Sequence, residues 1–255
     1  MTRIAQIFRY PVKGLSPEPL SSVEVTAGEA LPLDRAFALA HGSTQFDPLN
    51  PQYLSPSKFL MLKRNERLAT LRSRYNDETR TLIIERDGKQ VARGLIDQPV
   101  GRKTIEQFFA AYLGDEVRGI PKLLKARGHS FSDVPQKVLS LINISSIREL
   151  ERVMGRHLDP LRFRGNLYFD IGEPWREFDW CGHDIVVKGP DGEVRLKGLS
   201  RIERCAATNV NPETGERDSN IPKTLQSAFD HVDMGIYAEV LNDGVIATGA
   251  EIDTA

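Results

Sequence analysis

The stretch RIERCAATNVNPETGERD, residues 201–218, places a single cysteine just before an Asn-Pro-Glu-Thr-Gly turn. Cys205 follows Arg201 and Arg204, and the small or polar run 206–209 comes after it. Cationic neighbours favour the thiolate, which is the nucleophilic and metal-binding form of cysteine. A free cysteine is otherwise most often a small buried hydrophobe. The first question is therefore whether Cys205 is a core residue or a reactive thiol.

A reactive Cys205 has two possible roles. As a nucleophile it needs a base, commonly histidine; no neighbouring residue supplies one, but His183 or His231 could approach it through the fold. As a metal ligand it has no C-x-x-C, H-x-x-x-H or H-E-x-x-H motif to help it. A metal already chelated by an organic cofactor would need only one more soft ligand, and a thiolate suits that position.

The second cysteine and the two tryptophans favour structural roles. Cys181 stands in DWCGHD, where a Gly-His turn follows it, and we expect it at the end of a hairpin. Trp175 and Trp180 are expected to pack rather than to form a substrate platform.

Composition sets broad limits on function. A net charge of −1 over 255 residues argues against a general nucleic-acid binder, because such proteins usually carry a basic excess. No apolar run approaches the roughly 18–20 residues of a membrane span, and the N-terminus has no signal-peptide pattern. We therefore expect a cytoplasmic protein with two reduced thiols, no nucleic-acid partner and no membrane partner.

The first hundred residues indicate strands. Val23 and Val25 alternate with polar residues, 37–40 is apolar, and Asp87-Gly88 stands between two strand-like runs, which is a strong hairpin signal. The run 42–58 is rich in Pro, Ser and Asn and is predicted to be a loop. Strands at this spacing with little helix suggest a barrel or curled sheet.

Two helices are predicted in the middle of the chain. The first has Thr104 as its N-cap and ends at Gly114, and we expect its apolar face to hold Phe108, Ala111 and Tyr112. The second has Ser145 or Ser146 as its N-cap and ends before Pro160, and we expect its apolar stripe to hold Ile147, Leu150 and Val153.

The remaining segments indicate strands again. We expect 167–171, 183–189 and 193–199 to be hairpin partners, as well as the two arms of the Asp243-Gly244 turn within 236–252. The whole is predicted to be a β-dominated α+β protein, with a boundary between about 95 and 130.

Several cations could anchor an anionic cofactor. Arg162 and Arg164 bracket Phe163, and Lys13 and Arg35 lie in the N-terminal part. Arginine forks bind phosphate oxygens in bidentate fashion. Each of these charges could equally be a solvated surface group, and their spacing does not show that they converge.

Four blocks together resemble one family. They are YPVKGLS (10–16), LDRAFAL (33–39), RFRGNLYFD (162–170) and RCAATNVNPETGERD (204–218), in that order along the chain. The chain resembles a MOSC-domain protein (molybdenum cofactor sulfurase C-terminal domain) preceded by its N-terminal β-barrel partner domain. The resemblance implies a β-barrel-like domain over 1–105 and a MOSC β-barrel domain with a few helices over 106–255.

The resemblance also implies a site. Cys205 would be the protein ligand to molybdenum in a molybdopterin cofactor. The residues that would contact this cofactor are Lys13, Arg35, Asn143, Ser145, Ser146, Arg164, Asn166 and Arg204. Three positions depart from the relatives: Glu203 and Gly14 stand where serine is found, and Gly165 where proline is common.

The function implied is that of the amidoxime-reducing component family, whose members reduce N-hydroxylated small molecules. The chain has no Cys-rich iron–sulfur segment, so electrons would come from a separate donor protein of the ferredoxin or flavin type. An association with the pyridoxal phosphate-binding superfamily is also implied. Two alternatives stand beside the reductase: a sulfur-transfer protein carrying a Cys205 persulfide, and a non-enzymatic molybdopterin carrier.

Overall fold

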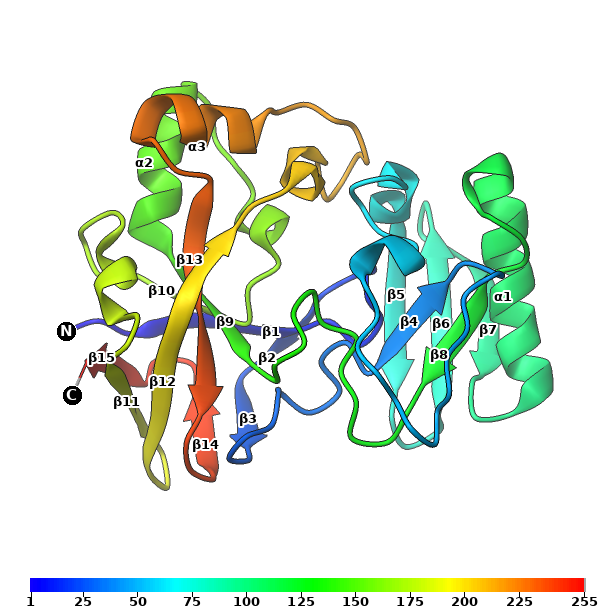
Figure 1. Cartoon of the computed structure of the whole chain (residues 1–255), viewed down its shortest axis with the longest axis horizontal. Coiled ribbons are helices and arrows are strands. Elements are labelled where there is room, and N and C mark those ends of the chain that lie inside the picture. Colours follow the sequence, from blue (N-terminus) through cyan, green and yellow to red (C-terminus); the bar gives the residue numbers. More distant parts are fainter. Residues whose placement is uncertain (255) are drawn as a thin grey trace.

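Two β-rich halves lie side by side in the computed structural model, which describes residues 1–254 (Figure 1). The large-sheet half contains the eight-stranded sheet together with α2 (Ile144–Met154) and α3 (Ile221–Phe229). The small-sheet half contains shorter sheets and α1 (Pro99–Leu113). The prediction of a β-dominated α+β protein is confirmed.

One mixed sheet organises the large-sheet half, and its core is almost wholly apolar. All neighbouring strands in it are antiparallel except β9 and β10, which run parallel. In spatial order the strands are β15 (Glu251–Thr254), β11 (Asp184–Gly189), β12 (Gly192–Glu203), β13 (Asp233–Val240), β9 (Leu139–Asn143), β10 (Leu167–Phe169), β1 (Ile4–Arg9) and β2 (Glu18–Leu20).

The N-terminal strands belong to this large-sheet half. β1 pairs with β10, and β3 (Ser22–Val25) pairs with β14 (Gly244–Ala247). Ile4 and Ile7 are buried in the same core as strands from the end of the chain. The chain therefore begins in the large-sheet half, crosses to the small-sheet half and returns. The domain boundary at residue 105 stays a prediction.

The small-sheet half is built from a hairpin sheet and a two-stranded sheet. Its strands are β5 (Leu71–Asn76), β6 (Thr81–Arg86) and β7 (Lys89–Leu95), with β4 (Phe37–Ala40) paired to β8 (Lys122–Lys125). The predicted hairpin at Asp87-Gly88 is confirmed between β6 and β7. Both turn residues have positive φ, of 52° and 73°, as the two-residue turn that joins twisted strands requires.

Helix α1 begins earlier than predicted. It begins at Pro99 rather than after Thr104, because proline is well suited to the first helical turn, where its missing N–H is not needed. The buried face of the helix also differs from the prediction. It consists of Ile105, Phe109 and Leu113, whereas Phe108, Ala111 and Tyr112 were expected. Gly114 ends the helix, as predicted.

Helix α2 has a different N-cap from the predicted serines. The side chain of Asn143 caps it by accepting from the Ser145 backbone N–H at 3.1 Å. Ile147 and Leu150 are buried as expected, whereas Val153 is exposed. Gly155 ends the helix in the left-handed conformation.

The predicted hairpin around Asp243-Gly244 is wrong. β13 already pairs with β12 on one edge and β9 on the other, so no edge is left for β14. The strand pairs instead with β3, which buries Ile246 beside Val23. The hairpin between β11 and β12 is confirmed.

Candidate functional site

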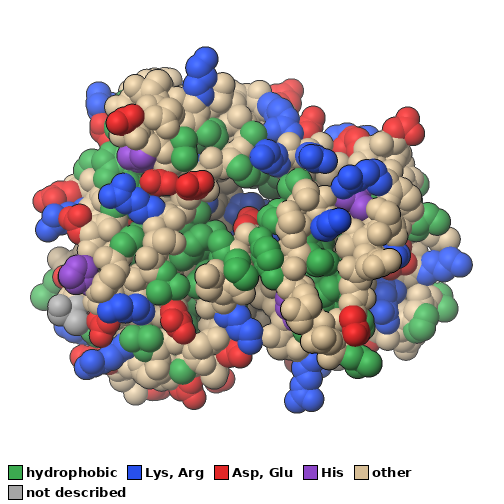
Figure 2. All heavy atoms as spheres, in the orientation of Figure 1, with side chains coloured by type: hydrophobic (Ala, Val, Ile, Leu, Met, Phe, Trp, Pro, Cys, Tyr) green, Lys and Arg blue, Asp and Glu red, His purple; other side chains and the backbone are tan. Residues whose placement is uncertain are grey.

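A cavity of about 460 Å³ lies between the two halves and draws its wall from both. Figure 2 shows the molecule hollowed between the halves, with Lys and Arg side chains gathered around the hollow. The small-sheet half contributes Arg35 and the segment 55–64, and the large-sheet half contributes Arg164 and Cys205.

Cys205 is an exposed thiol at this cavity, not a core residue. It follows the end of β12 and caps the short 3-10 helix Ala206–Asn209. Its carbonyl accepts from the N–H and the hydroxyl of Thr208, at 3.1 and 2.9 Å. The backbone is therefore fixed, while the sulfur faces open space.

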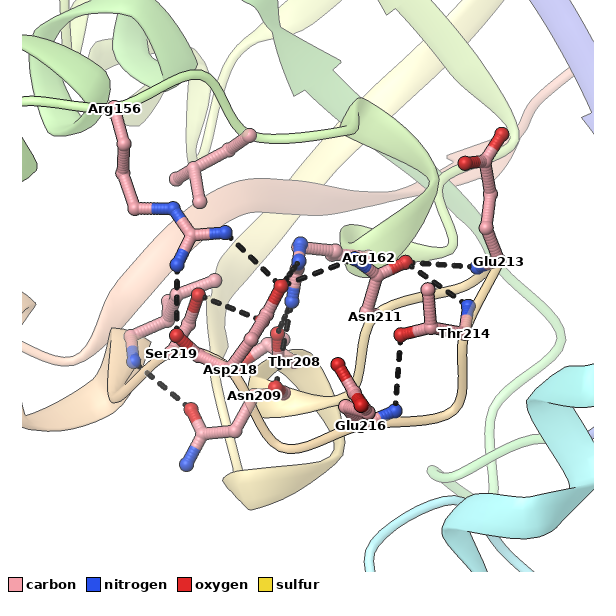
Figure 3. A network of polar contacts seen from close by, with 12 residues as sticks. Arg156, Arg162, Thr208, Asn209, Asn211, Glu213, Thr214, Glu216, Asp218 and Ser219 are labelled. Carbon is pink, nitrogen blue, oxygen red and sulfur yellow. Dashed lines mark hydrogen bonds and ion pairs between the residues drawn. The ribbon is translucent and has the colours of Figure 1, made fainter.

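The loop after Cys205 is held by a polar network (Figure 3). Asn211 Oδ1 accepts from the N–H groups of Glu213 and Thr214, which confirms the predicted turn. Asp218 Oδ2 accepts from Arg162 at 2.8 Å and from Arg156 at 2.9 Å. Partial burial would raise the pKa of Asp218, but these hydrogen bonds hold it well below the usual range. The two Nη atoms of Arg162 are thus committed to this network, whereas its buried Nε has no partner among the described residues.

Arg35 and Arg164, one from each half, form a cationic pair in the wall of the cavity. Their guanidinium carbons lie 4.6 and 4.2 Å from the ring centroid of the fully buried Tyr10. Arg35 Nη2 donates to the Arg164 carbonyl at 2.9 Å, and Arg35 also pairs with Asp34. Both arginines have positive φ of 50°, so the two backbones are held in a conformation that such side chains seldom adopt.

Arg164 keeps one donor without a partner. Its Nη1 donates to the Leu15 carbonyl at 2.9 Å, whereas Nη2 is buried and has no partner among the described residues. Burial lowers the pKa of Arg164. An unpaired buried donor costs free energy, and an anion in the cavity would remove that cost.

Lys13 adds a third cation. Its side chain is 7% exposed, and Nζ donates to the Phe131 carbonyl at 2.9 Å and to Asp133. Burial lowers the pKa of Lys13, and Asp133 opposes that effect. The Asp133 side chain is itself 69% exposed, and the Lys13 ammonium lowers its pKa. The two groups therefore form a charged pair.

Arg204 and Asn166 line the cavity but are already hydrogen-bonded. Arg204 donates to the carbonyls of Met234 and Phe163, and burial lowers its pKa. Asn166 accepts from the Ser140 hydroxyl at 2.9 Å and donates to the Phe8 carbonyl at 3.1 Å. Their role in this conformation is to hold the wall in place.

Three predicted site residues do not reach the cavity. Asn143 and Ser146 donate to the fully buried Glu177 at 2.9 and 2.8 Å, and Ser145 donates to Asp170. Burial raises the pKa of Glu177, although these hydrogen bonds work against it. The polar start of α2 therefore hydrogen-bonds Glu177 and Asp170, and these three residues are not part of the proposed cofactor site.

The two glycine departures follow from the backbone. Gly14 has a φ of +81°, where any other residue would be strained. A Cβ on Gly165 would stand 2.3 Å from Ile142 Cγ1. A serine at position 14 would therefore be strained by the backbone, and a proline at position 165 would clash with Ile142.

Sequence reasoning missed Asp133 and Tyr237, which also line the cavity. Asp133 stands in an irregular segment without a recognisable motif, and only the fold brings it to Lys13. Burial raises the pKa of Tyr237, so its hydroxyl stays protonated at neutral pH.

The other candidates lie elsewhere. There is no histidine among the described residues that line the cavity, and His231 packs against Trp175 instead. Arg201 lies 4.3 Å from the Phe178 ring and does not reach the cavity. Cys181 packs against the core of the large-sheet half, and Trp180 stacks on Phe169, which confirms packing roles.

The cavity has the charge of an anion site. Seven cationic side chains line it against three carboxylates, Asp34, Asp133 and Glu203. Apolar groups such as Met61, Leu62 and Ile202 complete the wall, so a ligand with both an anionic part and a flat organic part would find partners. A bare metal ion would not, because no three His, Cys, Asp or Glu side chains within residues 1–254 come together as ligands.

The donor set fits a molybdopterin-type cofactor. It offers an exposed thiol, an unpaired buried guanidinium donor and several cations, but no further protein ligands for a metal. A thiolate suits a metal that its cofactor already chelates.

Family models match nearly the whole chain. The MOSC N-terminal beta barrel domain matches residues 1–117, and the MOSC domain matches residues 127–253. The chain therefore belongs to the MOSC family, with both domains in the predicted order.

Individual relatives are more distant. The chain is 33% identical over 121 residues to a molybdenum cofactor sulfurase of Drosophila willistoni, a match over 45% of this chain and 14% of that protein. The YuaD protein of Bacillus subtilis is 12% identical, with a TM-score of 0.42 over 99% of this chain and 94% of its own. YiiM of Geobacillus stearothermophilus is 20% identical, with a TM-score of 0.36 over 46% and 53%.

Among the helices described in residues 1–254, none is long and apolar enough to cross a membrane.

Proposed function

We propose that this protein binds a molybdenum cofactor of the molybdopterin type in the cavity between its halves, with Cys205 as the protein ligand to the metal. One observation carries the proposal: the exposed thiol of Cys205 shares a cavity with Lys13, Arg35 and Arg164. Lys13 and Arg35 are distant in sequence from both Arg164 and Cys205. Family membership supports it.

The cations of the N-terminal part and Arg164 would hold the anionic end of the cofactor. Arg164 Nη2 is a buried donor without a partner among the described residues, and Arg35 stands beside it on the Tyr10 ring. Lys13 and Arg35 would each share the cofactor with a carboxylate, because they already pair with Asp133 and Asp34. Arg204 and Asn166 would keep the wall rigid.

We further propose that the reaction is reduction of N-hydroxylated small molecules, fed by a separate ferredoxin- or flavin-type electron donor. The bound cofactor would supply the two-electron chemistry at the N–O bond. The chain's own residues would bind and orient the substrate at the open side of Cys205, where Glu203 and Tyr237 offer a carboxylate and a protonated hydroxyl.

Turnover tests this proposal. Cofactor-loaded protein, reduced chemically, should convert benzamidoxime to benzamidine, and a Cys205→Ala variant should lose that activity. Cys181→Ala is the matched control and should retain it, because Cys181 lies outside the cavity. Absence of turnover across a broad panel of hydroxylamines and amidoximes would rule the reductase out.

Sulfur transfer is a second candidate, favoured by the exposure of Cys205 and by similarity to a protein named molybdenum cofactor sulfurase. The Cys205 thiolate would attack the outer sulfur of a donor persulfide and release the donor thiolate. Intact mass after incubation with a cysteine desulfurase and cysteine would then rise by about 32 Da, and the rise would be lost in Cys205→Ala. An unchanged mass would count against this function.

Three narrower expectations stay predictions: the role of a non-enzymatic molybdopterin carrier, cytoplasmic location, and the association with pyridoxal phosphate binding. The carrier is the simplest to separate, since it would bind the cofactor, pass it to an apo-enzyme and show no turnover.

A further inference from the structure

We propose a second ligand site, for a small organic carboxylate, in a cavity of about 260 Å³ in the small-sheet half. This rear cavity lies behind the segment 29–37, and Tyr75, Arg80, the segment 125–130 and Lys137 complete its wall. It is separate from the cavity at Cys205, and the two share only Asp34.

The hydroxyl of Tyr75 is the first reason. Tyr75 is 5% exposed, and no hydrogen-bond acceptor for its hydroxyl lies among the described residues. Arg80 and Lys125 are the cations that act on it, and both can only donate hydrogen bonds. The hydroxyl hydrogen therefore lacks an acceptor, and a ligand oxygen would supply one. Burial raises the pKa of Tyr75, so the hydrogen remains available.

The charges around the rear cavity are the second reason. The four cations that line it are Arg80, Lys125, Arg127 and Lys137. Three of them have carboxylate partners at exposed or half-exposed positions, namely Asp77, Asp97 and Glu29. Such surface pairs are weak and exchange readily. Arg127 has no ion pair within the described part of the chain.

The two lining carboxylates, Asp34 and Glu29, neutralise only one of these four cations, Lys137. Asp34 accepts from the Tyr10 backbone N–H at 2.8 Å and pairs with Arg35. Its carboxylate is therefore neutralised by Arg35, which lines the first cavity. Glu29 holds Lys137 with both oxygens, at 2.6 and 2.7 Å. An anion in the rear cavity would therefore meet donors rather than acceptors.

The apolar part of the wall selects the kind of anion. Leu31, Phe37 and Ala126 are buried residues of the lining, and the rings of Phe37 and Tyr75 lie 4.8 Å apart. A bare phosphate would leave these surfaces without a partner, whereas a carboxylate on a small apolar or aromatic body would cover them.

Binding of benzoate, observed by ¹H–¹⁵N correlation NMR, tests the site. We expect saturable shifts of the backbone amides of Tyr75, Ala126 and Gly128, and much smaller shifts around Cys205. Benzamide has the same shape without the charge and should bind at least about tenfold more weakly. Shifts confined to residues around Cys205 and Arg164 would overturn the proposal, as would equal affinity for the two compounds.

Two variants place the ligand. Tyr75→Phe keeps the ring and removes only the hydroxyl, so the fold should be retained while benzoate affinity falls about tenfold. Arg127→Gln changes an exposed side chain and should weaken benzoate several-fold without affecting the melting temperature. If Tyr75→Phe alters the fold, Arg127→Gln decides alone. Unchanged affinity in the folded variants would mean that benzoate binds elsewhere.

Discussion

Asp218 holds the loop behind Cys205 through one carboxylate. Its side chain is 20% exposed, and it accepts from Arg162, Arg156 and Asn211. The folded protein therefore keeps this carboxylate ionised at lower pH than the unfolded chain does. Because the pKa is depressed on folding, the stabilisation is full above the pKa of an unfolded aspartate, about 3.9, and is lost as pH falls below it.

We predict that Asp218→Asn lowers the free energy of unfolding at pH 7 by about 1–3 kcal/mol, since Arg162 would lose its buried partner. The difference from wild type should shrink between about pH 4 and pH 2. Urea unfolding at several pH values measures both. Asp179→Asn, at an exposed surface pair, is the control and should change little. A difference that stays constant with pH would contradict this account.

At the scale of helices and strands, local sequence signals predicted an element correctly where no strand distant in sequence had already taken its pairing edge. The Asp-Gly signal predicted the β6–β7 turn correctly but failed at Asp243-Gly244, because both edges of β13 were already paired. Helix α3 was not predicted, although Pro222 stands in its first turn. The cap of α2 was placed two or three residues late, at Ser145 or Ser146, because Asn143 also ends a buried strand.

Arg217 links the Cys205 loop to the small-sheet half. Its guanidinium donates to the carbonyls of Ala206, Leu62 and Lys63, and to Glu66 at 2.9 Å. One side chain thus ties the residue after the thiol to the opposite wall of the cavity.

We predict that Arg217→Ala destabilises the protein by about 1–2 kcal/mol and speeds amide hydrogen exchange in residues 205–218. Arg195→Ala is the matched control, because its nearest carboxylate is 4.0 Å away and exposed. Mass-spectrometric hydrogen exchange on the two variants and wild type measures the effect. Equal exchange in all three would show that the loop does not depend on this link.

At the scale of the whole molecule, the β-rich class and the thiol could be predicted from the sequence, but the convergence of the cations could not. Lys13 and Arg35 are more than a hundred residues from Arg164, and no local pattern sets such a distance. Family resemblance suggested that these cations meet. Only the structure shows that Asp133 pairs with Lys13, and that Ser145 and Ser146 donate to Asp170 and Glu177 instead of facing the cavity.

The path of the chain makes the two halves interdependent. A fragment of residues 106–255 would leave β10 without β1 and β14 without β3, and it would expose the core that Ile4 and Ile7 cover. We predict that this fragment lacks a cooperative thermal transition by circular dichroism, because it loses strands from the centre of one core. A sharp transition like that of the full chain would show that residues 106–255 fold alone.

The central claim is that Cys205 binds the metal of a cofactor held in this cavity. The most direct test is elemental analysis of wild type, Cys205→Ala and Cys181→Ala, purified alike from a host that makes the molybdenum cofactor. We predict about one molybdenum per chain in wild type and Cys181→Ala, and loss of the metal from Cys205→Ala with the fold intact by circular dichroism. Equal molybdenum in all three, or none in wild type from a host that loads a control molybdenum enzyme, would contradict the claim.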